Sequence, residues 1–223
     1  MESEKVTAPD KVEPKRAYGD ACGTAHALEL IGERWALLVL RELMLGPRRF
    51  SELKADLPGI SATVLTQRLT ELEQRGLVRR VRLPPPASVQ VYEATEWGLE
   101  AEAVVQALGR WAARSPHRDP TLPISGVSIL LSFRTMFDPE QARGFEARIG
   151  FVFADMSYVL EIGGGSLIVS RGDASGCDVV LRGDPTTVAA VVYFGLPLEK
   201  LKVDGDIGVA ERFVDLFKLS AKP

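Results

Sequence analysis

Apolar residues recur at intervals of three and four along the first part of the chain, a spacing typical of helices that bury one face. Within residues 24–45 this spacing is followed by Leu28, Ile31, Trp35, Leu38 and Val39. Gly32 interrupts the pattern, so we expect two helices that meet near this residue. Gly46-Pro47 then ends the second helix, and a short helix is expected over residues 52–57.

The segment Ser61–Arg75 carries the clearest helical pattern. Ser61 is an N-cap candidate, and Gly76 is suited to the residue just after the helix. Leu65, Leu69 and Leu72 form one apolar stripe along this helix. The opposite face is polar, and its only acidic neighbour is Glu73 at the margin. The segment is therefore a candidate for a helix that presents a polar surface to a partner.

The pattern changes from helical spacing to strands after residue 76. Strands are expected at 77–83 and 89–94, joined by three prolines that make a stiff tip. Thr95 is the N-cap candidate of a further helix that runs to about Ala113 and has an apolar side. Helix, helix, short strand, helix, helix, hairpin and helix is the element order of a winged helix-turn-helix, with the hairpin as the wing.

A polar, proline-flanked break at residues 115–120 marks a predicted domain boundary. Strands are expected beyond it at 151–160, 161–162, 167–171, 177–182 and 201–203, and helices at 185–194 and 207–219. The predicted fold class is α+β: a winged helix-turn-helix domain at 18–115 followed by a smaller α+β domain at 121–220. The polar segment at 1–17 is expected to be a flexible arm.

Charge is unevenly distributed, and this changes the functional picture. The net charge of the 223-residue chain is -3, but residues 34–82 hold ten basic and five acidic residues. A local positive excess of this kind favours contact with a phosphate backbone despite the acidic total.

Other residue counts narrow the classes of function. Two cysteines cannot form a disulfide scaffold, so we expect a reducing, cytoplasmic location. No apolar run approaches the roughly 18 residues of a membrane span, so no membrane partner is expected. Two histidines and two cysteines show no metal-ligand spacing, and no nucleophile–base pair can be assembled. The chain is therefore expected to be no enzyme and to need no metal or cofactor.

Several motifs in the first domain resemble the HxlR family of winged-helix regulators, which is related to the MarR group. They are CGTAHALELIGERWALLVLREL from Cys22, GPRRFSEL from Gly46, LPGIS from Leu57, LTQRLTELE from Leu65 and EATEWG from Glu93. They follow in the family's order over residues 18–114. The resemblance implies a homodimer that binds a near-palindromic operator in double-stranded DNA, often as a repressor and sometimes as an activator.

The second domain resembles the sterol-carrier-like (SCP2) fold by pattern. The run DVVLRGDP from Asp178, an apolar helix, and LKVDGDI from Leu201 carry the likeness, over roughly residues 125–218. Modules of this fold enclose an apolar tunnel, so the resemblance implies a small apolar effector. Phe133, Phe151, Phe194 and Phe213 are the candidate ligand-binding residues, against the alternative that they fill the core.

Candidate DNA-binding residues lie on the predicted recognition helix and around it. Thr63, Thr66 and Gln67 face the groove, where glutamine can read adenine and threonine can touch a thymine methyl group. Arg68 flanks the apolar stripe, so it either contacts phosphate or packs. The remaining candidates, at the helix cap, before the helix-turn-helix and on the wing, are Ser61, Arg48, Arg49, Arg79, Arg80 and Arg82.

Two alternative functions remain open. Cys22 lies where many HxlR-like proteins carry a cysteine, so the chain could be a thiol-based redox-sensing regulator. However, Gly23 stands where the family often has proline, and cysteine is also an ordinary small buried residue. The second alternative is a ligand-carrier protein, or an enzyme built on the second domain, in which the winged helix serves assembly.

Overall fold

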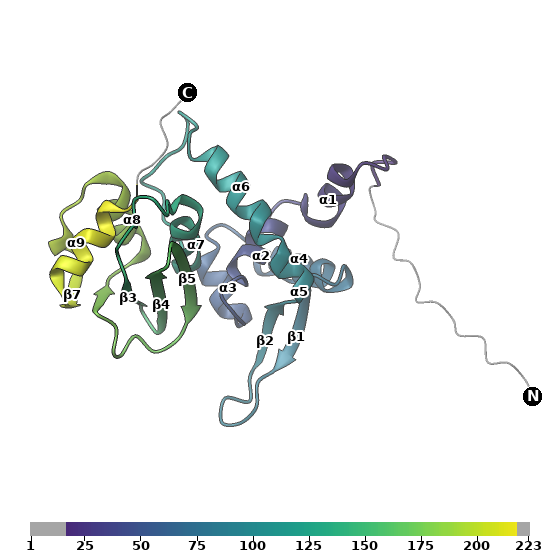
Figure 1. Ribbon diagram of the computed structural model, residues 1–223. Helices are drawn as coiled ribbons and strands as arrows, with labels where there is room; N and C mark the ends of the chain where they lie inside the picture. The colour runs from purple at the N-terminus through teal and green to yellow at the C-terminus, as the bar shows by residue number, and fades with distance from the viewer. Residues whose placement is uncertain (1–16, 218–223) are drawn as a thin grey trace, which may run out of the picture.

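The computed structural model describes residues 17–217. The predicted arm at 1–17 lies outside the described residues except for Ala17, as do residues 218–220 of the predicted second domain. From residue 17 onward, the first half contains six helices and two strands (Figure 1). They are α1 (Gly23–Ile31), α2 (Ala36–Glu42), α3 (Phe50–Asp56), α4 (Ala62–Gln74), β1 (Val78–Arg82), β2 (Gln90–Ala94), α5 (Glu96–Glu100) and α6 (Glu102–Ala112).

The helix ends of this half follow from local hydrogen bonds and backbone conformation. The hydroxyl of Ser61 accepts from the backbone N–H of Val64 at 3.2 Å, and Thr95 caps α5 in the same way. Gly76, just beyond α4, has a φ of 73°, which favours glycine. Leu65, Leu69 and Leu72 of α4 are buried, as their spacing predicts.

The wing is an antiparallel hairpin that projects from the body of the domain (Figure 1). Arg79 lies opposite Glu93 in its register, and Arg80 lies opposite Tyr92. Arg48 adds a one-residue bridge to Tyr92, with both backbone hydrogen bonds at 2.8 Å. The short strand expected before α3 is therefore reduced to a single bridging residue beside the two-stranded wing.

The second half is a five-stranded sheet of order β5-β4-β3-β6-β7 with helices on one face (Figure 1). All pairs are antiparallel except β3 with β6. Its elements are α7 (Gly126–Met136), β3 (Ala147–Phe153), β4 (Met156–Gly163), β5 (Ser166–Arg171), β6 (Val179–Arg182), α8 (Pro185–Phe194), the 3-10 turn η1 (Leu198–Lys200), β7 (Lys202–Gly205) and α9 (Ile207–Asp215).

Two features of this half differ from the sequence predictions. The single strand expected at 151–160 is two strands, because the chain reverses at Ala154, which has a φ of 48°. Helix α7 was not predicted at all. Its buried residues lie all around it, so it lacks the polar face by which an amphipathic helix is recognised. The helix at 185–194 agrees with α8 at both ends.

The two halves pack against each other, with α7 between α2 and α6 on one side and the sheet on the other. Ser125 donates to the buried carboxylate of Glu42 at 2.8 Å, and Arg134 of α7 pairs with Glu102 of α6 at 2.8 Å. One hydrophobic core runs through both halves. Across residues 17–217, every helix is too short or too polar to cross a membrane.

Candidate DNA-binding surface

The outer face of α4 is exposed and polar. Ser61, Thr63, Thr66 and Gln67 are all exposed, whereas the leucines on the opposite side fill the core. Thr70 continues the same exposed face one turn further along. The geometry presents uncharged hydrogen-bonding groups outward from a rigid, capped helix.

Besides the cap residue Ser61, two of these side chains already have hydrogen-bond partners within α4. The hydroxyl of Thr66 donates to the carbonyl of Ala62 at 3.0 Å, and the Gln67 amide donates to Glu71 at 2.9 Å. The Thr66 hydroxyl keeps its acceptor lone pairs. Gln67 would have to exchange Glu71 for a base edge in order to read it.

Arg68 is buried rather than presented to solvent. Its side chain is 8% exposed and lies 2.7 Å from the carboxylate of Glu71 and 3.4 Å from that of Glu33. Of the two roles expected for Arg68, packing and ion pairing fit this position. The arginine links α4 to the segment between α1 and α2 and offers no free charge to a phosphate.

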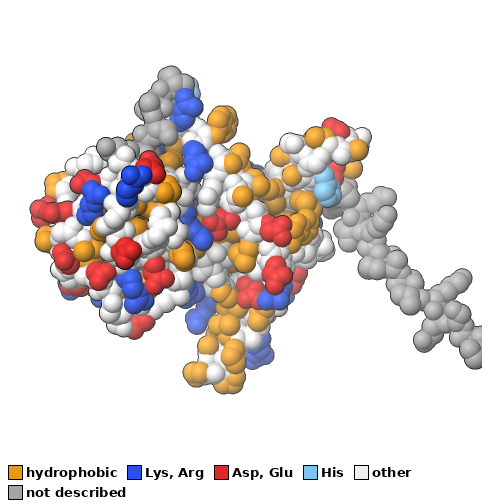
Figure 2. Space-filling model, in the orientation of Figure 1, with side chains coloured by type: hydrophobic (Ala, Val, Ile, Leu, Met, Phe, Trp, Pro, Cys, Tyr) orange, Lys and Arg blue, Asp and Glu red, His pale blue; other side chains and the backbone are white. Residues whose placement is uncertain are grey.

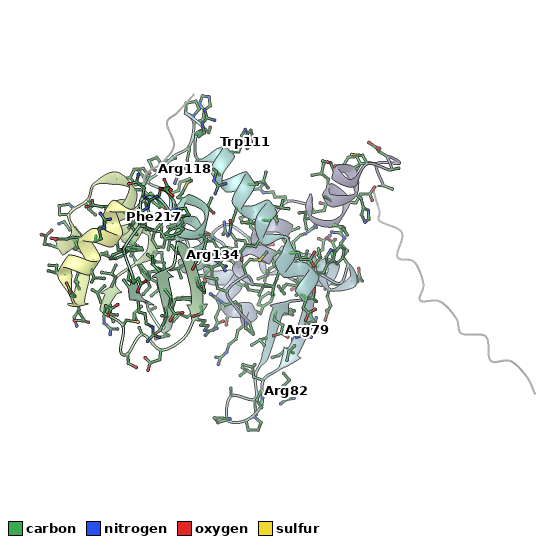
Figure 3. The ribbon with its side chains drawn as sticks, in the orientation of Figure 1. Arg79, Arg82, Trp111, Arg118, Arg134 and Phe217 are labelled. Carbon is green, nitrogen blue, oxygen red and sulfur yellow. The ribbon has the colours of Figure 1, made fainter. Side chains whose placement is uncertain are left out.

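The three wing arginines differ in how firmly they are held. Arg79 pairs with Glu93 at 2.5 Å, on the face of the hairpin away from Arg80. Arg80 lies 3.4 Å from Glu73 and stacks over the Tyr92 ring at 5.3 Å. Arg82 is exposed near the wing tip and has no ion pair among the described residues (Figure 3). Arg82 therefore holds the most available positive charge on the wing.

Arg48 and Arg49 are adjacent in sequence but lie in opposite environments. Arg49 is exposed at the start of α3. Arg48 is only 2% exposed, pairs with Asp56 and lies 3.4 Å from Glu52. The prediction that Arg48 contacts phosphate is corrected by its burial: its charge is neutralised inside the protein, where DNA cannot reach it.

An exposed apolar surface runs over α1, α5 and α6; the sequence predicts the apolar side of the helix after Thr95 but not its exposure. Neither α1 nor α6 has a fully buried residue, although both carry apolar stripes. Figure 2 shows orange side chains gathered over α1 and along α6. We call this set the α1–α6 surface; its exposed members are Leu28, Trp97, Leu99, Val104, Leu108 and Trp111. Trp111 is 75% exposed, which is unusual for tryptophan unless a partner covers it.

The four phenylalanines that are candidate ligand-binding residues do not line the cavity described below. Phe133, Phe151 and Phe213 are fully buried, and their rings contact one another at centroid distances of 5.2–5.7 Å. Phe194 is 44% exposed. A cavity of about 640 Å³ lies between the two halves of the chain, and none of the four lines it. The alternative that three of them fill the core fits these positions.

Cys22 is exposed at the N-terminus of α1. Hydrogen bonds from the backbone N–H groups of Thr24 and Ala25 lower the pKa of its thiol. Burial instead raises the pKa of the Cys177 thiol. Of the two cysteines, Cys22 is therefore the more readily ionised.

Comparison with known proteins places the first half of the chain among regulators. Residues 30–119 match the family model described as HxlR-like helix-turn-helix. The HTH-type transcriptional regulator YodB of Bacillus subtilis is 42% identical over 86 residues, covering 39% of this chain and 77% of YodB. An uncharacterized HTH-type transcriptional regulator of Mycobacterium tuberculosis is 32% identical over 151 residues, covering 60% of this chain and 93% of the relative. The solved structure of reduced YodB has 38% identity, covers 43% of this chain and 95% of that chain, and has a TM-score of 0.39.

Proposed function

This chain belongs to the HxlR-like helix-turn-helix family of DNA-binding transcriptional regulators, and we propose that it represses transcription as a homodimer on a near-palindromic operator. It is a regulator rather than an enzyme. The observation that carries the proposal is the exposed polar face of α4 beside a wing that bears three arginines. We further propose that it works in the cytoplasm, where a regulator meets DNA.

In this proposal α4 enters the major groove and the wing grips the flanking backbone. Thr63, Thr66 and Gln67 contact base edges, since they are exposed, close together and uncharged. The exposed arginines at the wing and at the start of α3 contact phosphates and set the register. These are Arg49, Arg79, Arg80 and Arg82, with Ser61 at the N-terminus of α4 beside them. Arg48 and Arg68 support the scaffold from inside.

The α1–α6 surface is the proposed dimer interface. Its apolar side chains are contiguous with the helix-turn-helix, so a second copy seated there would fix the distance between two recognition helices (Figure 2). Half-sites about one helical turn apart would then follow from the two-fold symmetry of the dimer. Burying these side chains would also remove the cost of exposing them to water.

We propose that the chain divides into a DNA-binding domain at 18–115 and an SCP2-like effector domain at 121–220. The boundary is supported by the proline-flanked segment that separates α6 from α7. The mixed sheet with helices on one face is compatible with an SCP2-like module. The effector would be an apolar small molecule whose binding changes operator affinity.

A gel-shift titration on DNA from upstream of its own coding sequence tests the proposed function. We expect saturable, salt-sensitive binding that the double variant Gln67→Ala/Arg80→Ala weakens at least tenfold, because each lost contact is worth about 1–3 kcal/mol. The matched control is Gln141→Ala/Arg143→Ala, an exposed pair on the second half, which should bind as the wild type does. Equal binding by both double variants would contradict the α4 interface. Absence of any DNA binding would favour the ligand-carrier alternative.

A second candidate function is thiol sensing through Cys22. Its exposure and the lowered pKa of its thiol favour reaction with oxidants or electrophiles. Because Cys22 is the residue at the N-cap position of α1, a modification there would act on the proposed dimer interface. Loss of operator binding after treatment with diamide, prevented by Cys22→Ser but not by Cys177→Ser, would support this function. An unchanged response in Cys22→Ser would contradict it.

A further inference from the structure

The cavity between the two halves of the chain is large enough for a ligand. Its volume is about 640 Å³, within the roughly 300–1,000 Å³ range of small-molecule sites. Its walls come from α2 and α6 on one side and from α7 and α8 on the other. Most of the lining is apolar, with Val105 and Ala112 on one wall and Ile129 and Ala189 on the other.

The charged groups around this cavity are all basic. Among the described residues that line it there is no aspartate or glutamate, whereas Arg41, His117 and Arg118 all contribute. Arg41 already has a partner, because its guanidinium lies 2.7 Å from the carboxyl group of Glu42. Arg118 has no carboxylate partner in the part of the chain that the structure describes, and it lies over the Phe194 ring at 5.9 Å. It follows α6, on the side that faces α7 and α8 (Figure 3).

Hydroxyl groups collect at the α7–α8 side of the same cavity. The hydroxyls of Ser132 and Tyr193 lie 2.9 Å apart, so one donates to the other. The Ser128 hydroxyl is shielded from solvent and finds no hydrogen-bond partner within residues 17–217. Burial raises the pKa of Tyr193, so its hydroxyl stays protonated. A buried polar group without a partner is rare in proteins, and a ligand oxygen would satisfy it.

We propose that this cavity binds an organic carboxylate with an apolar, ring-containing body. Arg118 would pair with the carboxylate, the hydroxyls of Ser128 and Tyr193 would meet its oxygens, and the apolar walls would hold the body. A neutral molecule of the same shape would leave the Arg118 charge uncompensated and would bind more weakly.

The position of the cavity also suggests how a bound ligand would affect the DNA-binding half of the chain. This part of the inference rests on the proposed function. Val105, Leu108, Gly109 and Ala112 of α6 line the cavity, and Leu108 also belongs to the α1–α6 surface, together with Val104 and Trp111 of the same helix. One helix therefore forms both the cavity wall and the proposed dimer contact. A ligand that shifts α6 would change the separation of the two recognition helices.

Calorimetric titration of the full chain without DNA tests the site. The probes are 2-naphthoate and its neutral counterpart 2-naphthamide. We expect 2-naphthoate to bind the wild type about tenfold or more tightly than the amide, and Arg118→Gln to remove this difference. Ala189→Phe fills the cavity, so neither probe should bind to it. Arg143→Gln, an exposed arginine outside the cavity, is the control and should leave both affinities unchanged.

Three results would overturn the proposal: no saturable binding of 2-naphthoate, binding that survives Ala189→Phe, or equal binding of the acid and the amide. Circular dichroism of each variant separates a lost site from a lost fold. Because the titration contains no DNA, its outcome is independent of operator binding. If the protein binds operator DNA but neither probe, only the proposed ligand site is refuted. If it binds 2-naphthoate but no DNA, only the proposed operator binding is refuted.

Discussion

Replacement of the buried Arg48 by glutamine separates the structural arginines from the DNA-binding ones. The guanidinium pairs with Asp56 and lies 3.4 Å from both a Glu52 carboxylate oxygen and the Tyr158 hydroxyl. Tyr158 belongs to the second half of the chain, so Arg48→Gln removes ion pairs within one half and a contact between the two.

The size of the loss follows from the exposure of the partners. Breaking a buried ion pair costs about 3–5 kcal/mol when the remaining charge stays buried. The side chains of Asp56 and Glu52 are 24% and 29% exposed, so water can solvate them once Arg48 is gone. We therefore expect a smaller loss, about 2–3 kcal/mol of unfolding free energy, which is roughly 5–10 °C in Tm for a chain of this size.

Thermal unfolding followed by circular dichroism and DNA binding followed by fluorescence anisotropy give the two readouts. Arg49→Gln is the matched comparison, because Arg49 is exposed and adjacent. It should change stability by less than about 0.5 kcal/mol and should weaken DNA binding. For Arg48→Gln we expect the opposite: lower Tm and near-normal affinity below the transition. A lower Tm for Arg49→Gln together with weaker DNA binding by Arg48→Gln would refute this account of the helix-turn-helix.

Three further outcomes are expected. Trp111→Glu should convert a dimer to a monomer in light scattering, because it puts a charge into the α1–α6 surface. Ile168→Glu, which replaces another exposed apolar residue on β5, should leave the dimer intact. A dimer in both variants would contradict the proposed interface. Arg82→Gln should lower the slope of log affinity against log salt by about 0.9, and an unchanged slope would mean that Arg82 contacts no phosphate. Burial raises the pKa of Glu42, against the charge of Arg41, so the folded state binds this proton more tightly than the unfolded chain does. Stability should therefore fall as the pH rises from about 4.3 through the raised pKa, and Glu42→Gln should flatten that fall; parallel pH profiles of unfolding would contradict it.

The helix-turn-helix could be predicted from sequence because its signals are local. A leucine stripe lies within α4, an N-cap at Ser61 and a glycine stop at Gly76 lie directly beside its ends, and each is present in the structure. The turn at Ala154 carries no glycine or proline, so nothing nearby in the sequence separates β3 from β4.

The environments of individual site residues depend on contacts that the sequence does not display. Arg48 is buried, and its guanidinium donates to the hydroxyl of Tyr158, which is 110 positions away. The cavity likewise needs residues from four helices in both halves, and its signal in the sequence is diffuse. The apolar stripe of α6 also has the pattern of a core-facing side, and only the structure shows that this side is exposed.

Selection of preferred sites from a random duplex library most directly tests whether the outer face of α4 reads DNA. The wild type should select an inverted repeat with half-sites about 10–10.5 base pairs apart, or a multiple of that spacing. Gln67→Ala should lose the preference at one position in each half-site, whereas Arg82→Gln should select the same sequence with lower affinity. Selection of no inverted repeat, or of an identical motif by Gln67→Ala, would contradict the claim that this helix face recognises the operator.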